Sequence, residues 1–83
     1  MKTVTLYTTE TCPYCRNAKF LLASRGVGMK EINIQTYPGK REEMVRRSGR
    51  RTVPQIFIGD TYIGGFDELA KLDRQGGLMS MLA

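Results

Sequence analysis

Cys12-Pro13-Tyr14-Cys15 contains the only two cysteines of this chain, and it stands where a strand gives way to a helix. The preceding segment, Thr3–Tyr7, is rich in β-branched and aromatic residues, which is typical of a strand. Downstream, apolar residues recur at helical spacing, and Gly26 supplies a stop signal. Pro13 suits the first position of a helix, because its missing N–H would have no partner there. We therefore predict a strand–turn–helix corner, with a helix over about residues 13–25 that begins at the cysteine pair.

The start of a helix changes the chemistry of a thiol that is placed on it. A free cysteine ionises near pH ~8.5, and only the thiolate is a good nucleophile. The unpaired N–H groups of the first turn and the positive end of the helix dipole favour the anion at Cys12. Cys15 lies about one turn further along, within reach of Cys12 for a disulfide. We predict a lowered pKa for Cys12 and a relatively inert Cys15.

Three other interpretations of the cysteine pair compete with a redox role. A purely structural disulfide is disfavoured, because closing so short a loop removes little entropy from the unfolded chain. A zinc site needs four ligands, and the chain has no histidine and no further cysteine, so the pair would supply only half of a shared site. Two ordinary buried cysteines are the third alternative. The position of the pair at a helix start favours the redox role.

Length and composition set the broad class of protein. With 83 residues, of which 41% are hydrophobic, the chain matches one small globular domain over residues 1–83. No apolar run is long enough to span a membrane, and the N-terminal residues lack the apolar stretch of a signal peptide. We expect a cytoplasmic protein, because in a reducing compartment a C-x-x-C pair is more often catalytic than structural.

The net charge of +5 comes from 13 basic and 8 acidic residues. The excess is concentrated between residues 40 and 51. Cations in the last turn of a solvated helix explain part of this group, because they complement the helix dipole. A nucleic-acid surface is disfavoured, since no aromatic residues alternate with the arginines and no binding motif is present. Attraction for small anionic peptides is the third interpretation.

The rest of the chain predicts a short and regular series of elements. Strands are expected over residues 29–34, 55–58 and 61–63, and helices over residues 40–48 and 66–74, before a short C-terminal segment over 78–82. Two strands joined through a helix form a right-handed parallel unit, and a later hairpin adds antiparallel strands. We predict an α/β fold, a four-stranded mixed sheet flanked by helices on both faces.

Two further motifs accompany the cysteine pair: Thr52-Val53-Pro54 precedes a strand, and Gly64-Gly65-x-Asp67 opens the last long helix. With these three motifs in this order, the chain resembles the dithiol glutaredoxins of the C-P-Y-C type over essentially its whole length. The resemblance implies a thioredoxin-like fold. It also implies an enzyme, a glutathione-dependent disulfide oxidoreductase with glutathione as co-substrate and no metal or bound organic cofactor.

The resemblance also assigns roles to individual residues. Cys12 is the nucleophile of the redox-active disulfide, and Cys15 resolves the intermediate. Val53, extended before a proline whose peptide bond is implied to be cis, offers its backbone to glutathione like an added strand. Free N–H groups at the last helix start receive the γ-glutamyl carboxylate, and Asp67 takes the amino group. The implied glutathione-binding residues are Tyr14, Arg41, Arg51, Thr52, Val53, Pro54, Gly65, Phe66 and Asp67.

Simpler interpretations compete at three of these positions. Pro54 also fits the start of a strand, Asp67 fits an acidic residue in the first turn of a helix, and Tyr14 fits a surface aromatic. One position departs from the family pattern. Many glutaredoxins carry a lysine three residues before the first cysteine, and this chain has Thr9 there. Arg41 and Arg51 match other carboxylate-contacting positions of the family, and Arg16 is a candidate electrostatic substitute near the thiol.

The partners implied by the resemblance are glutathione, glutathionylated proteins and disulfide-bearing reductases. Glutathione reductase and NADPH act indirectly, by recycling glutathione. We expect a monomer that binds neither nucleic acid nor membrane.

One alternative is a carrier in which two chains and two glutathiones share a [2Fe–2S] cluster through Cys12. Pro13 opposes it, because family members with that role usually have a less rigid residue there. A second alternative, a glutathione-independent thioredoxin-like reductant, is opposed by Gly64-Gly65-x-Asp67. The paired thiols disfavour a non-catalytic binding module.

Overall fold

The computed structural model describes all residues of the chain, 1–83. Its elements are β1 (Val4–Thr8), α1 (Pro13–Ser24), β2 (Met29–Asn33), α2 (Lys40–Ser48), β3 (Gln55–Ile58), β4 (Thr61–Gly64), α3 (Phe66–Arg74) and α4 (Gly77–Leu82). Every predicted helix and strand is present, with ends within one residue of those expected from the sequence. None of these helices is long and apolar enough to cross a membrane.

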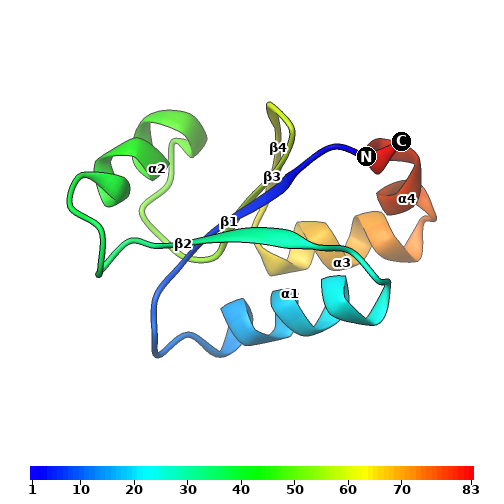
Figure 1. Ribbon diagram of the computed structural model, residues 1–83, viewed down its shortest axis with the longest axis horizontal. Helices are drawn as coiled ribbons and strands as arrows, with labels where there is room; N and C mark the ends of the chain where they lie inside the picture. Colours follow the sequence, from blue (N-terminus) through cyan, green and yellow to red (C-terminus); the bar gives the residue numbers. More distant parts are fainter.

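The four strands form one mixed sheet in the order β2-β1-β3-β4 (Figure 1). β1 runs parallel to β2 and antiparallel to β3, and β3 runs antiparallel to β4. A parallel neighbour requires a crossover, which α1 supplies between β1 and β2. The tight turn between β3 and β4 joins antiparallel neighbours directly. The predicted α/β fold with a mixed sheet is confirmed.

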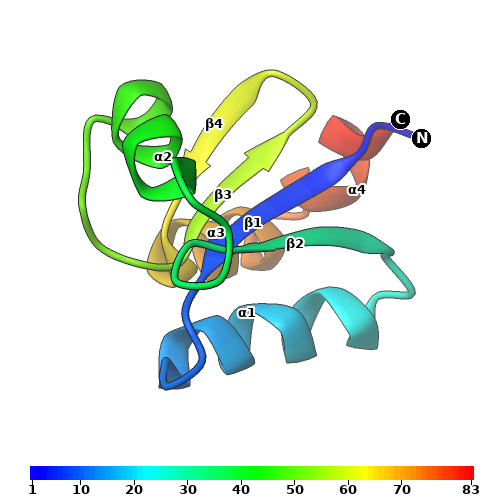
Figure 2. The same cartoon turned by 60° about the vertical axis from the view of Figure 1, so that its left-hand side comes forward.

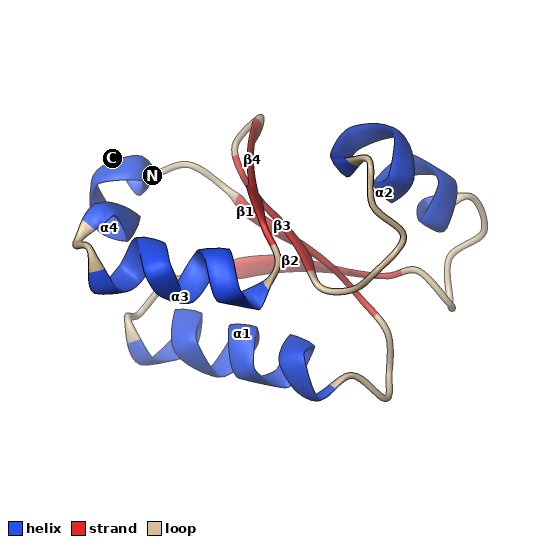
Figure 3. Ribbon diagram, turned by 180° about the vertical axis from the view of Figure 1, so that it is seen from behind, coloured by secondary structure: helices blue, strands red, loops and turns tan.

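The larger core lies between the sheet and the helices α1, α3 and α4. In Figures 1 and 3, α1 and α3 run side by side on the same face of the sheet. Alternate strand residues and one stripe from each helix fill the space between them, as the two periodicities require. The ten buried residues of this core are Val4, Leu6, Ala18, Leu22, Val27, Ile56, Ile58, Leu69, Leu78 and Leu82.

A smaller core lies on the opposite face of the sheet, beneath α2 (Figure 2). Its five buried residues are Tyr7, Ile32, Ile34, Met44 and Phe57. The phenol of Tyr7 donates a hydrogen bond to Oε2 of Glu43 at 2.6 Å and accepts one from Arg47 at 2.8 Å. The Arg47 guanidinium lies 4.0 Å from the centroid of the Phe57 ring, a cation–π contact. A polar cluster therefore joins α2 to the sheet where apolar side chains are few.

The C-terminal segment, predicted only as a short piece of chain, forms the helix α4. Leu78 and Leu82 are four residues apart, so they share one helical face, and both are buried in the larger core. The backbone N–H of Lys2 donates to the carbonyl of Leu82 at 2.9 Å. The two ends of the chain consequently lie next to each other (Figure 1).

Candidate active site

The sheet topology brings the three sequence motifs to one end of the molecule. The cysteine pair follows the carboxyl end of β1, and Thr52-Val53-Pro54 precedes the amino end of β3. Because β1 and β3 are antiparallel neighbours, with Tyr7 opposite Gln55, these two ends lie side by side. β4 returns in the opposite direction and ends at Gly64, opposite Ile56, so the start of α3 joins the same end. Segments more than 40 residues apart in sequence thus meet at one site.

Cys12 and Cys15 are joined by a disulfide, with their Cα atoms 5.2 Å apart. Cys12 is the N-cap of α1, in extended conformation, and Pro13 follows at the first helical position as predicted. The backbone N–H of Cys15 donates to the sulfur of Cys12 at 3.0 Å, so a first-turn amide points at this atom. Cys12 is 6% exposed and Cys15 only 1%, so Cys12 is the more accessible of the two. The Cys12 sulfur also lies 3.8 Å from the carbonyl oxygen of Val53.

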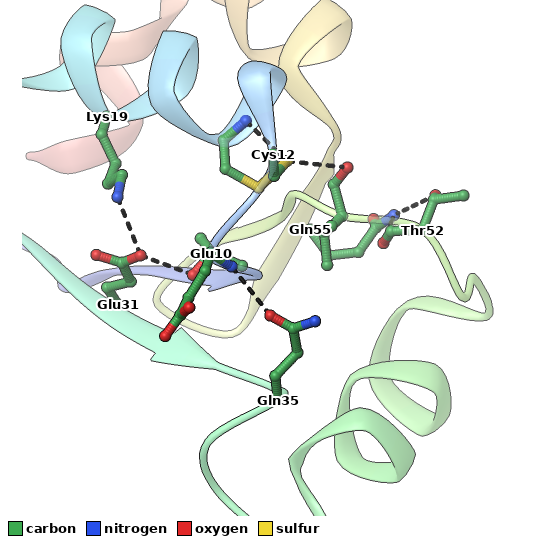
Figure 4. Close-up of a disulfide and its surroundings, with 10 residues drawn as sticks. Glu10, Cys12, Lys19, Glu31, Gln35, Thr52 and Gln55 are labelled. Carbon is green, nitrogen blue, oxygen red and sulfur yellow. Dashed lines mark hydrogen bonds and ion pairs between the residues drawn. A yellow bond between two sulfur atoms is a disulfide. The ribbon is translucent and has the colours of Figure 1, made fainter.

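Polar contacts hold the loop before Cys12 and the sheet beside it. The backbone N–H of Glu10 donates to the side-chain carbonyl of Gln35 at 3.1 Å. The buried hydroxyl of Thr8 donates to Glu31 at 2.7 Å, and Lys19 of α1 contacts the same carboxylate at 3.1 Å. The Thr8 hydrogen bond, assisted by Lys19 and opposed by partial burial, lowers the pKa of Glu31. Figure 4 shows the Lys19–Glu31 pair on one side of the disulfide.

Thr52 and Gln55 lie on the other side of the disulfide from the Lys19–Glu31 pair (Figure 4). The Val53–Pro54 peptide bond is cis, as the resemblance implied. The buried side chain of Gln55 donates to the carbonyl of Thr52 at 3.0 Å, and Figure 4 shows these two residues next to each other. Gln55 also accepts a hydrogen bond from the hydroxyl of Tyr62 at 2.6 Å. Gln55 therefore fixes the backbone of this segment. One sequence signal pointed to this role, since Gln55 is the only polar residue of the strand Gln-Ile-Phe-Ile.

A cleft of about 270 Å³ opens between this segment and the start of α3. Seven of the nine residues that the resemblance assigned to glutathione line it, namely Tyr14, Thr52, Val53, Pro54, Gly65, Phe66 and Asp67. Three further lining residues were missed by the sequence reasoning, namely Arg50, Gln55 and Glu68. The rings of Tyr14 and Phe66 lie 6.3 Å apart, and Tyr14 is 60% exposed, so the cleft has an accessible aromatic wall near the cysteines.

The other two expected residues, Arg41 and Arg51, do not line this cleft. They lie with Arg46 around a separate hollow of about 310 Å³ against α2. No carboxylate of the chain forms an ion pair with any of these three guanidinium groups. Glu42 also lines the hollow, so its walls carry three arginines against one carboxylate and have a net positive charge. Arg16, the candidate substitute for the family lysine, is exposed on α1 and lines neither hollow.

The start of α3 is shaped by a side chain that folds back over it. The carboxylate of Glu68 accepts the backbone N–H of Gly65 at 2.7 Å. Gly64 has φ +125°, and a Cβ at this position would lie 2.5 Å from that carboxylate. Gly64 thus makes room for Glu68, whereas Gly65 faces the cleft. The next N–H groups of the first turn have no partner within the helix, and Asp67 stands beside them in the cleft wall.

Comparison with known proteins decides the family. The family model for glutaredoxin matches residues 4–63, which include all of β1 to β3 and both cysteines. The chain belongs to the glutaredoxin family. It is 56% identical over 82 residues to glutaredoxin 3 of Escherichia coli strain K12, covering 99% of each protein.

Two solved glutaredoxin structures are similar over nearly the whole chain. The solution structure of glutaredoxin from Brucella melitensis is 49% identical with a TM-score of 0.86, covering 99% of this chain and 89% of that one. The crystal structure of a buckwheat glutaredoxin–glutathione complex is 30% identical with a TM-score of 0.89, covering 98% of this chain and 76% of that one. The fold is therefore the thioredoxin-like fold that glutaredoxins share.

Family and geometry together establish the class of chemistry. This glutaredoxin has a redox-active cysteine pair at the start of α1, with the more exposed sulfur facing a first-turn amide. A thiolate at such a position attacks a disulfide sulfur, and a neighbouring thiol completes the exchange. The protein is a thiol–disulfide oxidoreductase.

Proposed function

We propose that this protein is a dithiol glutaredoxin of the C-P-Y-C type that uses glutathione as co-substrate. Its substrates would be protein–glutathione mixed disulfides, low-molecular-weight disulfides and protein disulfides. The observation that carries the proposal is the cleft beside the disulfide, lined by seven residues that the family resemblance assigns to glutathione. The similar buckwheat protein, whose structure is described as a glutathione complex, supports the same ligand.

The unpaired backbone of Val53 supports an extended peptide ligand. Its N–H and carbonyl take no part in the backbone hydrogen bonds of the chain, although they border the cleft. Unpaired backbone groups next to a sheet bind a peptide in the manner of an added strand. A tripeptide held in this way would place its central cysteine near Cys12, whose sulfur is 3.8 Å from the Val53 carbonyl. Thr52 and Pro54 would form the floor of the same strand site.

The two ends of glutathione carry charges that the surrounding residues complement. The γ-glutamyl carboxylate would accept the free N–H groups at the start of α3, and Asp67 would bind its amino group. Tyr14, Gly65 and Phe66 would cover the body of the tripeptide. Arg41 and Arg51, on the separate basic hollow, would contact the glycyl carboxylate in place of the lysine that Thr9 replaces.

The proposed reaction proceeds by two thiol–disulfide exchanges. The Cys12 thiolate attacks the glutathione sulfur of a mixed disulfide, and the substrate thiolate leaves and takes up a proton. A second glutathione thiolate then attacks the Cys12 mixed disulfide, which releases glutathione disulfide and restores the Cys12 thiolate. The N–H of Cys15, 3.0 Å from the sulfur, stabilises the negative charge in both steps. The absence of histidine fits this scheme, because the attacking group is already ionised.

Protein disulfides would follow a dithiol route. Cys12 attacks one sulfur of the substrate, and Cys15 then attacks Cys12 to release the reduced protein and form the Cys12–Cys15 disulfide. Two glutathiones return this disulfide to the dithiol, and glutathione reductase with NADPH recycles the glutathione disulfide that forms. The low exposure of Cys15, 1% against 6% for Cys12, fits a resolving rather than an attacking residue. We place this monomeric enzyme in the reducing cytoplasm.

A coupled assay tests the proposal directly. Purified protein is mixed with glutathione, NADPH, glutathione reductase and a small glutathione mixed disulfide, and NADPH oxidation is followed. We expect turnover that requires both glutathione and Cys12: Cys12→Ser abolishes it, whereas Cys15→Ser retains deglutathionylation and loses the reduction of protein disulfides. Equal turnover with thioredoxin reductase and NADPH in place of glutathione and glutathione reductase would instead identify a thioredoxin-like reductant, and activity in Cys12→Ser would refute the assigned nucleophile.

A further inference from the structure

Arg50 and Glu68 face each other in the cleft, and neither was anticipated from the motifs. Both side chains line it, and the guanidinium of Arg50 lies 3.6 Å from the carboxylate of Glu68. Arg51, the next residue, lies on the other hollow with Arg41 and Arg46. The segment after α2 therefore divides two adjacent arginines between two surfaces. Arg50 is the only cationic residue that lines the cleft.

The backbone around Arg50 is held in place. α2 ends at Ser48, and Gly49 after it adopts the left-handed conformation with φ 74°, which turns the chain sharply out of the helix. The backbone N–H of Arg50 then donates to the hydroxyl of Ser48 at 3.0 Å. Gln55 fixes the other end of the segment through the Thr52 carbonyl. The Arg50 side chain thus starts from a defined position at the edge of the cleft.

The Arg50–Glu68 contact leaves most of the guanidinium free. At 3.6 Å it is an ion pair that is too long for a hydrogen bond, and the two side chains are 55% and 46% exposed. The same Glu68 oxygen is already hydrogen-bonded to the N–H of Gly65 at 2.7 Å. An exposed pair of this kind is weak, and an arginine carries five N–H donors. The guanidinium of Arg50 therefore keeps N–H donors that are available to a carboxylate entering the cleft.

We propose that Arg50 is a specificity-determining residue that binds the α-carboxylate of the γ-glutamyl group, exchanging its contact with Glu68 for one with the ligand. This inference rests on the proposed glutathione function and deepens it. The choice of carboxylate follows from position: the partner of Arg50 is Glu68, in the first turn of α3, next to Asp67 and the free N–H groups. Arg50 thereby supplies a cation beside the helix start, and Asp67 supplies the anion for the amino group.

The first test compares the loss of charge at two arginines. We expect Arg50→Ala to raise the KM for a glutathione mixed disulfide about fivefold, with kcat changed less than about twofold, because an exposed charge pair contributes binding of that order. Arg74→Ala, at the other end of α3 and outside the cleft, removes the same charge and leaves KM unchanged. Arg50→Lys restores most of the affinity, and higher salt narrows the gap between wild type and Arg50→Ala.

The second test asks which carboxylate Arg50 binds. A mixed disulfide of γ-glutamylcysteine lacks the glycine and its carboxylate but keeps the γ-glutamyl end. We expect the KM penalty of Arg50→Ala to be as large with this substrate as with the glutathione compound. Loss of the penalty would assign Arg50 to the glycyl carboxylate and overturn the inference.

The third test removes the internal competitor. Glu68→Gln keeps an oxygen that accepts the N–H of Gly65 but no longer attracts Arg50. We expect a KM at or below that of the wild type, and an unchanged penalty for adding Arg50→Ala; a raised KM would contradict the exchange. If the wild type shows no glutathione-dependent turnover, the proposed function itself fails. If it turns over normally while Arg50→Ala and Arg74→Ala have equal KM values, only the role of Arg50 is refuted.

Discussion

Replacing Tyr7 with phenylalanine removes one buried hydroxyl and leaves the rest of the side chain in place. Tyr7 is fully buried, and its phenol bridges the Glu43 carboxylate at 2.6 Å and the Arg47 guanidinium at 2.8 Å. Both partners belong to α2, whereas Tyr7 belongs to β1. The substitution therefore cuts the polar connection between that helix and the sheet without creating a large cavity.

The expected cost follows from what each partner keeps. A hydrogen bond to a charged group contributes roughly 1.5–3 kcal/mol when the partner is left unsatisfied. Glu43 retains its ion pair with Lys40 at 2.9 Å, Arg47 retains its position over the Phe57 ring, and both charged groups reach solvent. We therefore expect a loss at the lower end, about 1.5 kcal/mol of unfolding free energy. In a domain of this size this corresponds to a melting temperature lower by roughly 6–12 °C.

Urea and thermal unfolding of the oxidised protein measure this effect. Tyr37→Phe is the matched control, because Tyr37 is 55% exposed and its hydroxyl makes no hydrogen bond to the protein. We expect the control to unfold at the same urea concentration and temperature as the wild type. Tyr7→Phe should unfold at lower values of both, with the same slope of unfolding free energy against urea concentration. Coincident transitions for the two variants would refute the view that the Tyr7 hydroxyl stabilises the α2 side of the fold.

The loss of unfolding free energy in Tyr7→Phe should also depend on pH. The hydrogen bond from Tyr7, followed by that from Lys40, lowers the pKa of Glu43 in the folded state. A carboxyl with a lowered folded pKa adds stability above its unfolded pKa of about 4.3, and that stability is lost as pH falls through the folded value. We expect the difference between wild type and variant to be largest near neutral pH and to narrow below about pH 4.

Three further changes test other parts of the structure. Leu69→Ala, in the larger core, should lower the unfolding free energy by about 2–5 kcal/mol in denaturant titrations, because a fully buried leucine leaves a cavity; a cost near zero would contradict its burial. Glu31→Gln should lower the unfolding free energy by about 1 kcal/mol at pH 7. The hydrogen bond from Thr8 lowers the pKa of Glu31, and the stability it adds disappears as pH falls through that lowered pKa. The unfolding free energy of the variant should therefore fall less steeply toward acid pH than that of the wild type. Arg51→Ala should raise the KM for glutathione several-fold in the coupled assay, and an unchanged KM would remove Arg51 from the proposed binding set.

Much of the fold could be predicted because it depends on local patterns. The helix start at Pro13 and the stop before Gly26 follow from a fixed backbone angle and from conformational freedom, which are properties of single residues. The alternation of strands with one intervening helix then restricts the topology to a parallel crossover and a hairpin. The meeting of three motifs at one end of the sheet was implied by the resemblance to glutaredoxins.

The side-chain details of the site could not be predicted in this way. Arg50 and Arg51 are chemically identical neighbours, yet their side chains line different hollows. The turn at Gly49 and the hydrogen bond from the Arg50 N–H to Ser48 set the backbone that separates them. Tyr7 finds its partners 36 and 40 residues away, a separation that no periodic pattern encodes. Gln55 interrupts an apolar strand, but its partners across the site become apparent only in three dimensions.

The unequal anchoring of the two faces of the sheet has a consequence for large substrates. α2 buries a single side chain, that of Met44, whereas the helices of the other face supply five of the ten buried residues of the larger core, namely Ala18, Leu22, Leu69, Leu78 and Leu82. Regions with few buried apolar contacts detach at a lower free-energy cost than the whole domain unfolds. α2 is followed directly by residues 49–54, which include one wall of the cleft. Detachment of α2 would therefore move this wall away from Cys12, which stays in place at the start of α1. A bulky protein disulfide could thus be admitted by a local loosening, which amide exchange along α2 ahead of β1 would reveal.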